Sequence, residues 1–420
     1  MTEDFRLSKV QILIQQKKFK EAEKILSDLL TADPNNTLLL SFLAEVNLQQ
    51  DKFDVANSIT ENAIGLSPDD PHLFFLKSRI AIQQGNLKDA EKNIDHAIEL
   101  DPYDADYVAL LANIKLGRKR FEEALEIADR ALEIDAENLL ALNTRSTALN
   151  KLNRSDESFE TIEGALREDP NNAYTHANYG WGLLEQGNHK KALEHFKEAL
   201  TNDPNFGYAQ SGMLEALKAN NPVYRLFLKY SFWIGNLTSR YQWGVIIGFY
   251  VCYNVLKTIA RNNNALQPYL MPLVILMGLL AFSTWIITPI SNLFLRFNKY
   301  GQMLLSEKEK LSSSFVAGSL AACIIGLLLC IIIPDEKMLA IAAFGFAMML
   351  PLGTMFSPSN SKHGLLIYTV ILGIVGLLAI GISFATDKIF NLMTVLFILG
   401  FVAFQWVANY MLIKEDNRWG

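Results

Sequence analysis

Side chains that could carry out acid-base, nucleophilic or metal chemistry are sparse in this sequence of 420 residues. Among the six histidines, His189 and His195 stand six residues apart, a spacing that does not place two metal ligands on one helical face. The sequence has no His-Glu-x-x-His motif and no glycine-rich phosphate loop. The three cysteines, Cys252, Cys323 and Cys330, lie in apolar segments, where they are typical of small packing residues. We therefore expect no metal site and no cofactor.

Ser383 lies in a short motif that resembles a known nucleophile motif. The run Gly381-Ile382-Ser383-Phe384 is similar to the Gly-x-Ser-x motif of the rhomboid intramembrane proteases. Those enzymes place the histidine base on a later helix, whereas no histidine follows Ser383 here and His363 precedes it in a loop. We interpret Ser383 as a helix-packing serine and expect no enzymatic activity. An intramembrane enzyme stays an alternative on this motif alone.

The charges divide the chain into two halves of opposite sign. Residues 1–220 hold 24 Lys and Arg against 37 Asp and Glu, a net charge of −13, and residues 221–420 hold 14 against 7, a net charge of +7. The two values add to the −6 of the whole chain. The acidic half would repel phosphates, which excludes nucleic acid as a partner. Three cysteines in this length exclude a secreted scaffold built on disulfides.

The acidic half carries a repeat with a period of 34 residues. Turn prolines keep this period at Pro34, Pro68, Pro102, Pro170 and Pro204, with Ala136 in the skipped slot. Small residues keep it too, at Val10, Ala44, Ser78, Ala112, Ser146 and Gly180, at Ala22, Ala56, Ala90, Ala124, Ser158 and Ala192, and at Leu29, Ala63, Ala97, Ala131, Ala165 and Ala199. Small residues let two helices cross closely, and the residue before a proline leaves the helix. The repeat therefore predicts stacked pairs of short helices.

This pattern resembles the tetratricopeptide repeat family over residues 3–206. The six units are 3–36, 37–70, 71–104, 105–138, 139–172 and 173–206, and residues 208–219 resemble the extra helix that caps the last unit. Lys9, Lys77 and Arg145 lie at the seventh position of their units, where the family usually has an aliphatic residue. The resemblance implies a solenoid whose first helices line a concave groove for a protein or peptide partner.

Groove positions can be carried over from the family to this chain. The clamp that holds a C-terminal carboxylate needs lysines at the second and fifth positions, and this chain has none there, although Asn113 fits the ninth. The groove is instead a mixture of polar and aromatic side chains. We expect partner contacts from Phe75, Arg79, Asn113, Asn143, Tyr174 and Trp181. The alternative is that these side chains only pack between neighbouring first helices.

The second half contains six apolar segments, each close to the length that crosses a bilayer. They are residues 241–260, 268–290, 312–333, 338–357, 364–385 and 389–412. Lys257 is the one charged residue inside them, whereas a proton- or ion-coupled transporter usually keeps ionisable groups at membrane depth. Residues 222–237 and 292–305 mix basic and aromatic side chains, which is typical of helices that lie in the headgroup layer.

Basic residues in the loops predict the orientation in the membrane. One side has Lys218, Arg225, Lys229, Arg240, Arg296, Lys299, Lys308, Lys310, Lys362, Lys414 and Arg418. The other side has only Lys257, Arg261, Lys337 and Lys388. The richer side contains both termini, so we expect a multi-pass protein of the bacterial cytoplasmic membrane with both termini in the cytoplasm. The absence of a basic segment followed by an apolar run at the N-terminus agrees.

These observations predict an all-α protein made of a solenoid of six helix pairs followed by a polytopic helical membrane domain. The expected parts are a cytoplasmic solenoid with its capping helix at 1–220, an interfacial linker at 221–240, a membrane domain at 241–413 and a cytoplasmic tail at 414–420. The favoured function is a membrane-anchored scaffold or assembly adaptor whose partners are a protein or peptide and the lipid bilayer, with or without self-association. A transporter or channel with a regulatory repeat domain is the alternative.

Overall fold

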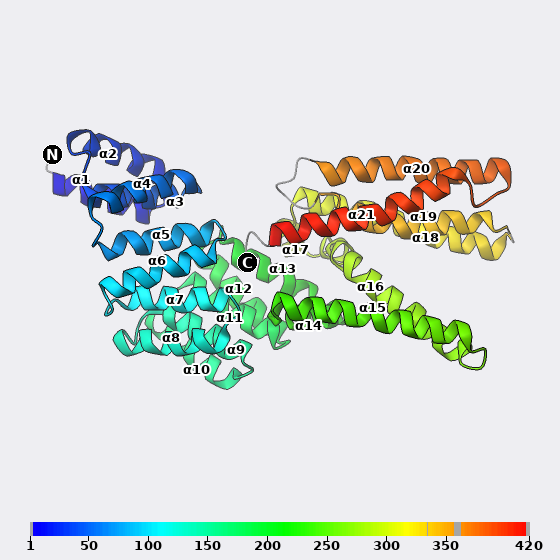
Figure 1. Ribbon diagram of the computed structural model, residues 1–420, viewed down its shortest axis with the longest axis horizontal. Helices are drawn as coiled ribbons and strands as arrows, with labels where there is room; N and C mark the ends of the chain where they lie inside the picture. Colours follow the sequence, from blue (N-terminus) through cyan, green and yellow to red (C-terminus); the bar gives the residue numbers. More distant parts are fainter. Residues whose placement is uncertain (1–2, 334, 357–362, 417–420) are drawn as a thin grey trace. The chain divides into compact units, whose positions relative to one another are not determined.

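The computed structural model describes residues 3–333, 335–356 and 363–416, and within these ranges the chain is helical with no strand (Figure 1). The fold class is therefore all-α, as predicted. Lys362, Arg418 and most of the expected tail lie outside the described residues. Residue contacts divide the chain into one unit that ends at Asn178 and a second unit, Tyr179–Glu415. This division falls inside a helix, and the functional boundary expected at residue 220 stays a prediction.

The first unit is a succession of helix pairs in the predicted register. Consecutive helices pack against each other along the chain. The helices are α1 (Glu3–Gln15), α2 (Phe19–Ala32), α3 (Thr37–Leu48), α4 (Phe53–Leu66), α5 (Pro71–Gln83), α6 (Leu87–Leu100), α7 (Ala105–Gly117), α8 (Phe121–Ile134), α9 (Leu139–Lys151) and α10 (Ser155–Glu168). The sixth pair is α11 (Ala173–Glu185) and α12 (His189–Asn202), and α13 (Gly207–Lys218) is the predicted capping helix.

The small residues of the repeat lie where the helices of a pair cross. Every one of the repeated small positions is buried, and most have no exposed surface. Where serine replaces alanine, its hydroxyl is satisfied inside the pair. Ser78 Oγ donates to the Ala90 carbonyl at 2.8 Å, and Ser158 Oγ donates to the Ser146 carbonyl at 2.8 Å. A larger side chain at these crossings would separate the two helices, which explains the period seen in the sequence.

The turns repeat as regularly as the helices. The turn before each second helix contains a residue with a positive φ, at Lys17, Asp51, Lys119 and Asn153 and at the glycines Gly85 and Gly187, so the interval is 34 throughout. Each second helix ends in extended backbone, as at Asp33 with φ −134° and ψ 84°. Asp135 adopts nearly the same geometry before Ala136, so this turn keeps its shape without a proline.

Side chains at the end of each unit cap the next first helix. Asn36 accepts from the Leu39 amide, and Asn138 accepts from the Ala141 amide. Asp70 and Asp104 do the same for α5 and α7. Each cap satisfies an amide that has no partner within its own helix, and a cap is typically worth about 1 kcal/mol.

The second unit continues with α14, the short α17 and six longer, mostly apolar helices. These are α14 (Pro222–Asn236), α15 (Ser239–Asn262), α16 (Gln267–Leu295), α17 (Lys299–Leu304), α18 (Glu307–Ile332), α19 (Lys337–Thr354), α20 (Gly364–Thr386) and α21 (Leu392–Asp416). Among the residues that the structure describes, five stretches are long and apolar enough to cross a membrane: Tyr241–Asn262, Gln267–Thr284, Glu307–Ile332, Lys337–Thr354 and Gly364–Thr386. The sixth expected segment forms α21, which includes the apolar stretch Leu392–Ala408.

One expected boundary in this half is wrong. The sequence predicted an apolar segment at 268–290 and a separate interfacial helix at 292–305, whereas α16 runs on to Leu295 and only the short α17 follows. At the expected break, Ser291 and Asn292 are 7% and 4% exposed, so both polar side chains are buried against protein within α16.

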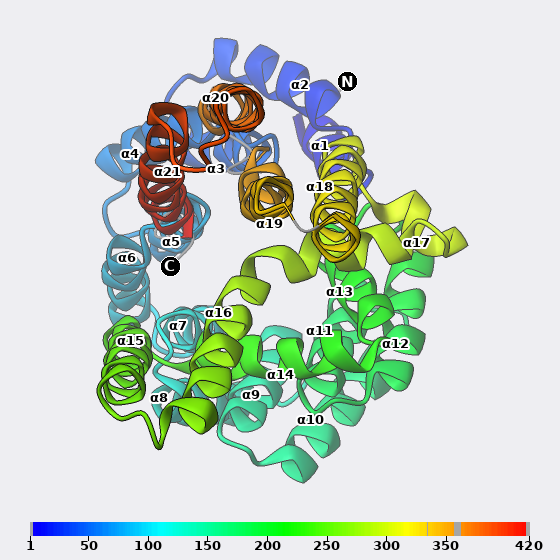
Figure 2. The same cartoon turned by 90° about the vertical axis from the view of Figure 1, so that its right-hand side faces the viewer.

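Two glycines bring α18 and α19 into backbone contact. A Cβ atom on Gly345 would lie 2.5 Å from the Cys323 backbone nitrogen, and one on Gly326 would lie 2.4 Å from the Ala342 nitrogen. Ser319 Oγ donates to the Gly345 carbonyl at 2.7 Å across the same contact. Small residues and a serine hydroxyl at the crossing are typical of helices that associate in lipid. The two helices run side by side in both views (Figure 2).

Candidate partner-binding groove

The six residues expected to contact a partner all lie on first helices of the repeat. Phe75 and Arg79 belong to α5, Asn113 to α7 and Asn143 to α9, while Tyr174 and Trp181 belong to α11. First helices carry the concave face of such a solenoid, so the predicted positions share one kind of surface. The structure gives these residues three different surroundings.

Arg79 is held in place by its neighbours in the preceding unit. Its guanidinium donates two hydrogen bonds to the Glu45 carboxylate, at 2.6 and 3.0 Å, across one repeat interval. The same guanidinium lies 5.6 Å above the ring of Phe75. Phe75 in turn packs on Tyr107, with ring centroids 5.1 Å apart. A two-pronged ion pair that is also stacked on a ring fixes the direction of the arginine before any partner arrives.

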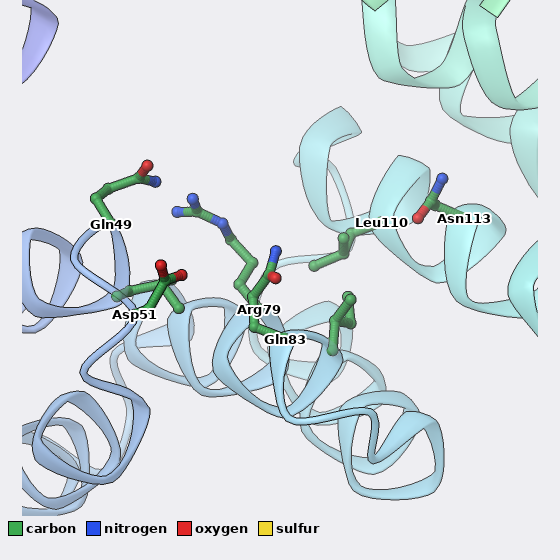
Figure 3. Close-up of a pocket in the computed structure, with 8 residues that line it drawn as sticks. Gln49, Asp51, Arg79, Gln83, Leu110 and Asn113 are labelled. Carbon is green, nitrogen blue, oxygen red and sulfur yellow. The ribbon is translucent and has the colours of Figure 1, made fainter. Parts of the chain in front are cut away.

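A pocket of about 280 Å³ opens beside Arg79, between the second, third and fourth units. Its polar lining is Gln49, Asp51, Arg79, Gln83 and Asn113, and its apolar lining is Leu48, Ile82 and Leu110. Figure 3 shows Arg79 extending toward Gln49 and Asp51, with Leu110 and Asn113 on the next first helix. The pocket thus combines an apolar floor with amide and charged groups, as binding sites commonly do.

Two predicted residues, Arg79 and Asn113, line this pocket, and the glutamines that also line it were missed. Gln83 lies four residues beyond Arg79, so the two side chains share one helical face. The sequence did contain a signal for this row. Gln15, Gln49 and Gln83 recur at the repeat period, at the thirteenth position of the first three units, four residues beyond the ninth.

Asn143 is a buried link between two units. It is 1% exposed, and its amide donates to Thr175 Oγ1 at 2.9 Å while its side-chain oxygen accepts from Asn178 Nδ2 at 3.2 Å. Thr147 donates to Asn178 as well, at 3.0 Å. These bonds join α9 to α11, so Asn143 shapes the wall of the groove and offers little surface to a partner.

Trp181 lies in an aromatic cluster within the second unit. Its ring is 5.7 Å from Phe196, 5.6 Å from Tyr208 and 6.3 Å from Phe232, measured between centroids. Its indole N–H donates to the Tyr208 carbonyl at 3.2 Å. Phe232 belongs to α14, so a later helix of the chain itself contacts the half-buried ring of Trp181. Tyr174, on the same helix, is 41% exposed.

Two of the three basic residues that depart from the family pattern form ion pairs with the preceding unit. Lys77 Nζ lies 3.2 Å from Glu61, and Arg145 Nε lies 2.6 Å from Asp129. Both pairs join a first helix to the second helix of the unit before it. At these two positions an ion pair therefore replaces the apolar contact of an aliphatic side chain, because a carboxylate lies at the equivalent point of each preceding helix.

Ser383 has the contacts of a helix-packing residue. It is 1% exposed, its hydroxyl donates to the Ala379 carbonyl at 2.8 Å, and Asn391 donates to it at 3.0 Å. His363 caps the opposite end of α20, and at 1.5 Å of rise per residue about 30 Å separates the two. They cannot form a nucleophile and base pair. Among the described residues, no three His, Cys, Asp or Glu side chains are grouped to hold a metal ion.

Comparisons with known proteins support the repeat family. Tetratricopeptide repeat profiles match residues 47–114 and residues 173–206. No curated protein matches the chain in sequence.

Several solved structures resemble the array at low identity. YrrB, described as a TPR protein with an unusual peptide-binding site, is 17% identical over 44% of this chain and 96% of its own, with a TM-score of 0.32. TTC0263, a TPR protein from Thermus thermophilus, is 17% identical over 43% of this chain and 98% of its own, with a TM-score of 0.41. A tetratricopeptide repeat protein from Parabacteroides merdae is 17% identical over 49% and 80%, with a TM-score of 0.44.

Because these TM-scores are low, the assignment rests on the profile matches and on the helix pairs themselves. The matches fall in the second to fourth units and in the sixth, and the structure shows helix pairs in the same register from residue 3 to residue 202. Residues 47–114 and 173–206 therefore match tetratricopeptide repeats, within an array of helix pairs that keep one register.

Proposed function

We propose that this chain is a membrane-anchored interaction protein that binds an extended segment of a protein or peptide in the groove of its second to fourth units. The pocket beside Arg79 carries the proposal. It is lined by three consecutive first helices or their turns, and its polar groups point into one space (Figure 3).

The lining of this pocket suits a peptide main chain. Gln83 and Asn113 carry side-chain amides that both donate and accept hydrogen bonds, so they can pair with the N–H and C=O groups of an extended strand. Leu48, Ile82 and Leu110 provide an apolar surface for one side chain of the partner. The charge of Arg79 is largely balanced by Glu45, so an acidic partner gains no unpaired cation there.

The C-terminal end of the groove has a different role. Asn143 is buried between units, and the half-buried ring of Trp181 packs on Phe232 of α14. We assign both to the support of the groove and place the partner contacts at Phe75, Arg79, Asn113 and Gln83. Tyr174 is exposed but belongs to the sixth unit, outside this part of the groove. The repeat positions predicted partner contacts from the third to the sixth unit. This assignment confines the partner site to the first four of the six units.

Photocrosslinking in membranes tests the location. A crosslinking amino acid at Gln83, inside the pocket, should give a discrete adduct. The matched variant carries it at Arg130, an exposed residue of the second helix α8. An adduct at both positions, or at neither, would contradict a partner site in this pocket.

Affinity then tests the energetics. Replacing Asn113 with Ala should reduce the binding free energy of the captured partner by about 2 kcal/mol, roughly a thirtyfold loss of affinity, because interface energy concentrates in a few buried contacts. The melting temperature should stay the same, since the side chain of Asn113 makes no hydrogen bond with any residue that the structure describes. Lower stability with unchanged affinity would assign Asn113 to repeat packing.

The membrane part of the proposal rests on five helices of sufficient length and apolarity. We propose that they cross the bacterial cytoplasmic membrane together with α21, which returns the chain to the side on which it began. Both termini then lie in the cytoplasm, in agreement with the basic loops. A cysteine introduced at Asn36 should resist labelling by a membrane-impermeant reagent on intact cells. Labelling from outside would overturn this topology.

A further inference from the structure

Helix α14 has two apolar faces rather than one. Val223, Leu226, Tyr230 and Trp233 are 63%, 72%, 45% and 52% exposed. Their spacing of three, four and three residues places all four on one face of the helix. An exposed stripe of this kind on a helix of a soluble domain would expose a contiguous apolar surface to water without a compensating contact.

The opposite face of α14 packs on the end of the repeat array. Tyr224 is 2% exposed, and its hydroxyl donates to Glu215 of α13 at 2.6 Å. Lys218 pairs with the same Glu215 at 2.9 Å and lies over the Tyr224 ring. Near the other end of α14, Asn236 donates to Glu185 of α11 at 2.6 Å. The contacts at both ends fix the rotation of α14, and with it the direction of the exposed stripe.

The chain that follows α14 determines what this stripe can meet. The first stretch able to cross a membrane begins at Tyr241, which follows Asn236 by only five residues. Even a fully extended segment of this length reaches about 17 Å. The stripe is therefore held close to the surface of any bilayer that α15 enters. Lys229, exposed on α14, flanks the stripe with a positive charge.

We propose that α14 lies in the headgroup layer of the cytoplasmic leaflet, with its exposed stripe at the boundary with the acyl chains and Lys229 beside the phosphates of anionic lipids. Its other face holds α13 and the end of α11, so α14 fixes the last repeat to the membrane surface. The proposal rests on the proposed membrane anchoring. The occupant of the stripe is lipid, because the adjoining helix enters the bilayer within a few residues.

The test uses the full chain with its cysteines replaced, reconstituted in lipid vesicles. An environment-sensitive fluorophore is attached at Leu226→Cys, in the stripe, or at Ser231→Cys. Ser231 is exposed and lies about 140° around the helix from Leu226. A third label at Ile325→Cys reports on α18, where Ile325 is 54% exposed and faces lipid if that helix crosses the membrane. Acrylamide, a neutral quencher in water, measures the accessibility of each label.

The Leu226 label should emit at shorter wavelength and resist acrylamide, and the Ser231 label should be quenched. Protection at Leu226 should be stronger in vesicles with phosphatidylglycerol than in pure phosphatidylcholine, and Lys229→Gln should remove that difference. Quenching at Leu226 together with protection at Ile325 would overturn this inference and leave the membrane anchoring intact. Quenching at Ile325 would overturn the anchoring itself. Protection at Leu226 only at high protein density would assign the stripe to contact between copies, and would also overturn the inference.

Discussion

Replacing Gly212 with Ala should destabilise the end of the repeat array, although alanine is the better helix former. Phe196 has no exposed surface and lies between Gly180 and Gly212. A Cβ atom on Gly212 would lie 2.2 Å from Phe196 Cε1 and 2.3 Å from Cζ, whereas carbon atoms in contact prefer about 3.5–4.0 Å. Gly180 borders the same ring so closely that a Cβ there would lie 2.8 Å from Cε1, so the ring has little room to shift toward that backbone.

The magnitude follows from two opposing terms. Overpacking a well-filled site costs about 1–3 kcal/mol, and an overlap of more than an ångström on both ring atoms places this site at the upper end. Alanine gains up to about 1 kcal/mol over glycine in a helix interior. The net loss should be about 2 kcal/mol, which corresponds to roughly a thirtyfold increase in local opening.

Hydrogen exchange on the full chain measures this loss where it occurs. The amides of α12 and α13 should lose about thirtyfold of their protection, and those of α3 and α4 should be unchanged, because neighbouring units respond locally. Gly164→Ala, in the middle of α10, is the matched control. Its Cβ would meet only the end of Arg167 at 3.9 Å, so protection there should stay or rise.

A second variant makes the reasoning refutable. Shortening the ring with Phe196→Leu should cost stability alone but should relieve Gly212→Ala, so the double variant should be more stable than the sum of the two losses. Strict additivity, or normal protection in Gly212→Ala, would show that the ring does not fill the space between the glycines.

Three further outcomes are expected. Gly85→Ala should cost about 1 kcal/mol, measured by thermal unfolding, because an L residue at φ 74° is strained. The pKa of Glu23 lies below its ordinary value because Gln50 and a neighbouring lysine donate to it, so this carboxylate stabilises the fold above its unfolded pKa and the benefit disappears as pH falls through the folded pKa. Glu23→Gln should accordingly lower the melting temperature near pH 7, and the difference should shrink as pH falls below the unfolded pKa of a glutamate, about 4.3. Gly345→Val should separate α18 from α19 and lower the melting temperature in detergent, whereas Gly381→Ala, with open space around it, should not.

The periodic features of this chain were predictable, and the contacts between distant segments were not. A fixed interval of small residues defines helix crossings, since a crossing admits only small side chains, and the buried positions agree in all six units. The surroundings of Trp181 depend on Phe232, which lies outside the repeat and follows no period. Burial of Asn143 depends on the residues that face it from α11, Thr175 and Asn178, which its own position in the repeat does not reveal.

In the apolar half, the positions of the apolar segments were predictable from the sequence, whereas the residues at which the helices end were less so. Hydropathy located the apolar segments, because a continuous run of about 20 apolar residues is visible in the sequence itself. The break expected between residues 290 and 292 is absent, since α16 continues through Ser291 and Asn292, which are buried against protein. The pocket beside Arg79 shows a similar limit, because its glutamine row lies at the thirteenth position of the unit, four residues beyond the last groove position carried over from the family.

The positive-φ turns have a consequence for how this array could change in length. Gly85 and Lys119 occupy the same point of successive units with the same sign of φ, one with glycine and one without. Deleting residues 86–119 would join Gly85 to Arg120 with the backbone geometry already present at both ends. The turns therefore do not fix the number of units in the solenoid. A duplication or loss of 34 residues between equivalent turns requires new side-chain contacts only where the two joined units meet. Such an event would change the length of the solenoid and leave the fold of each unit unchanged.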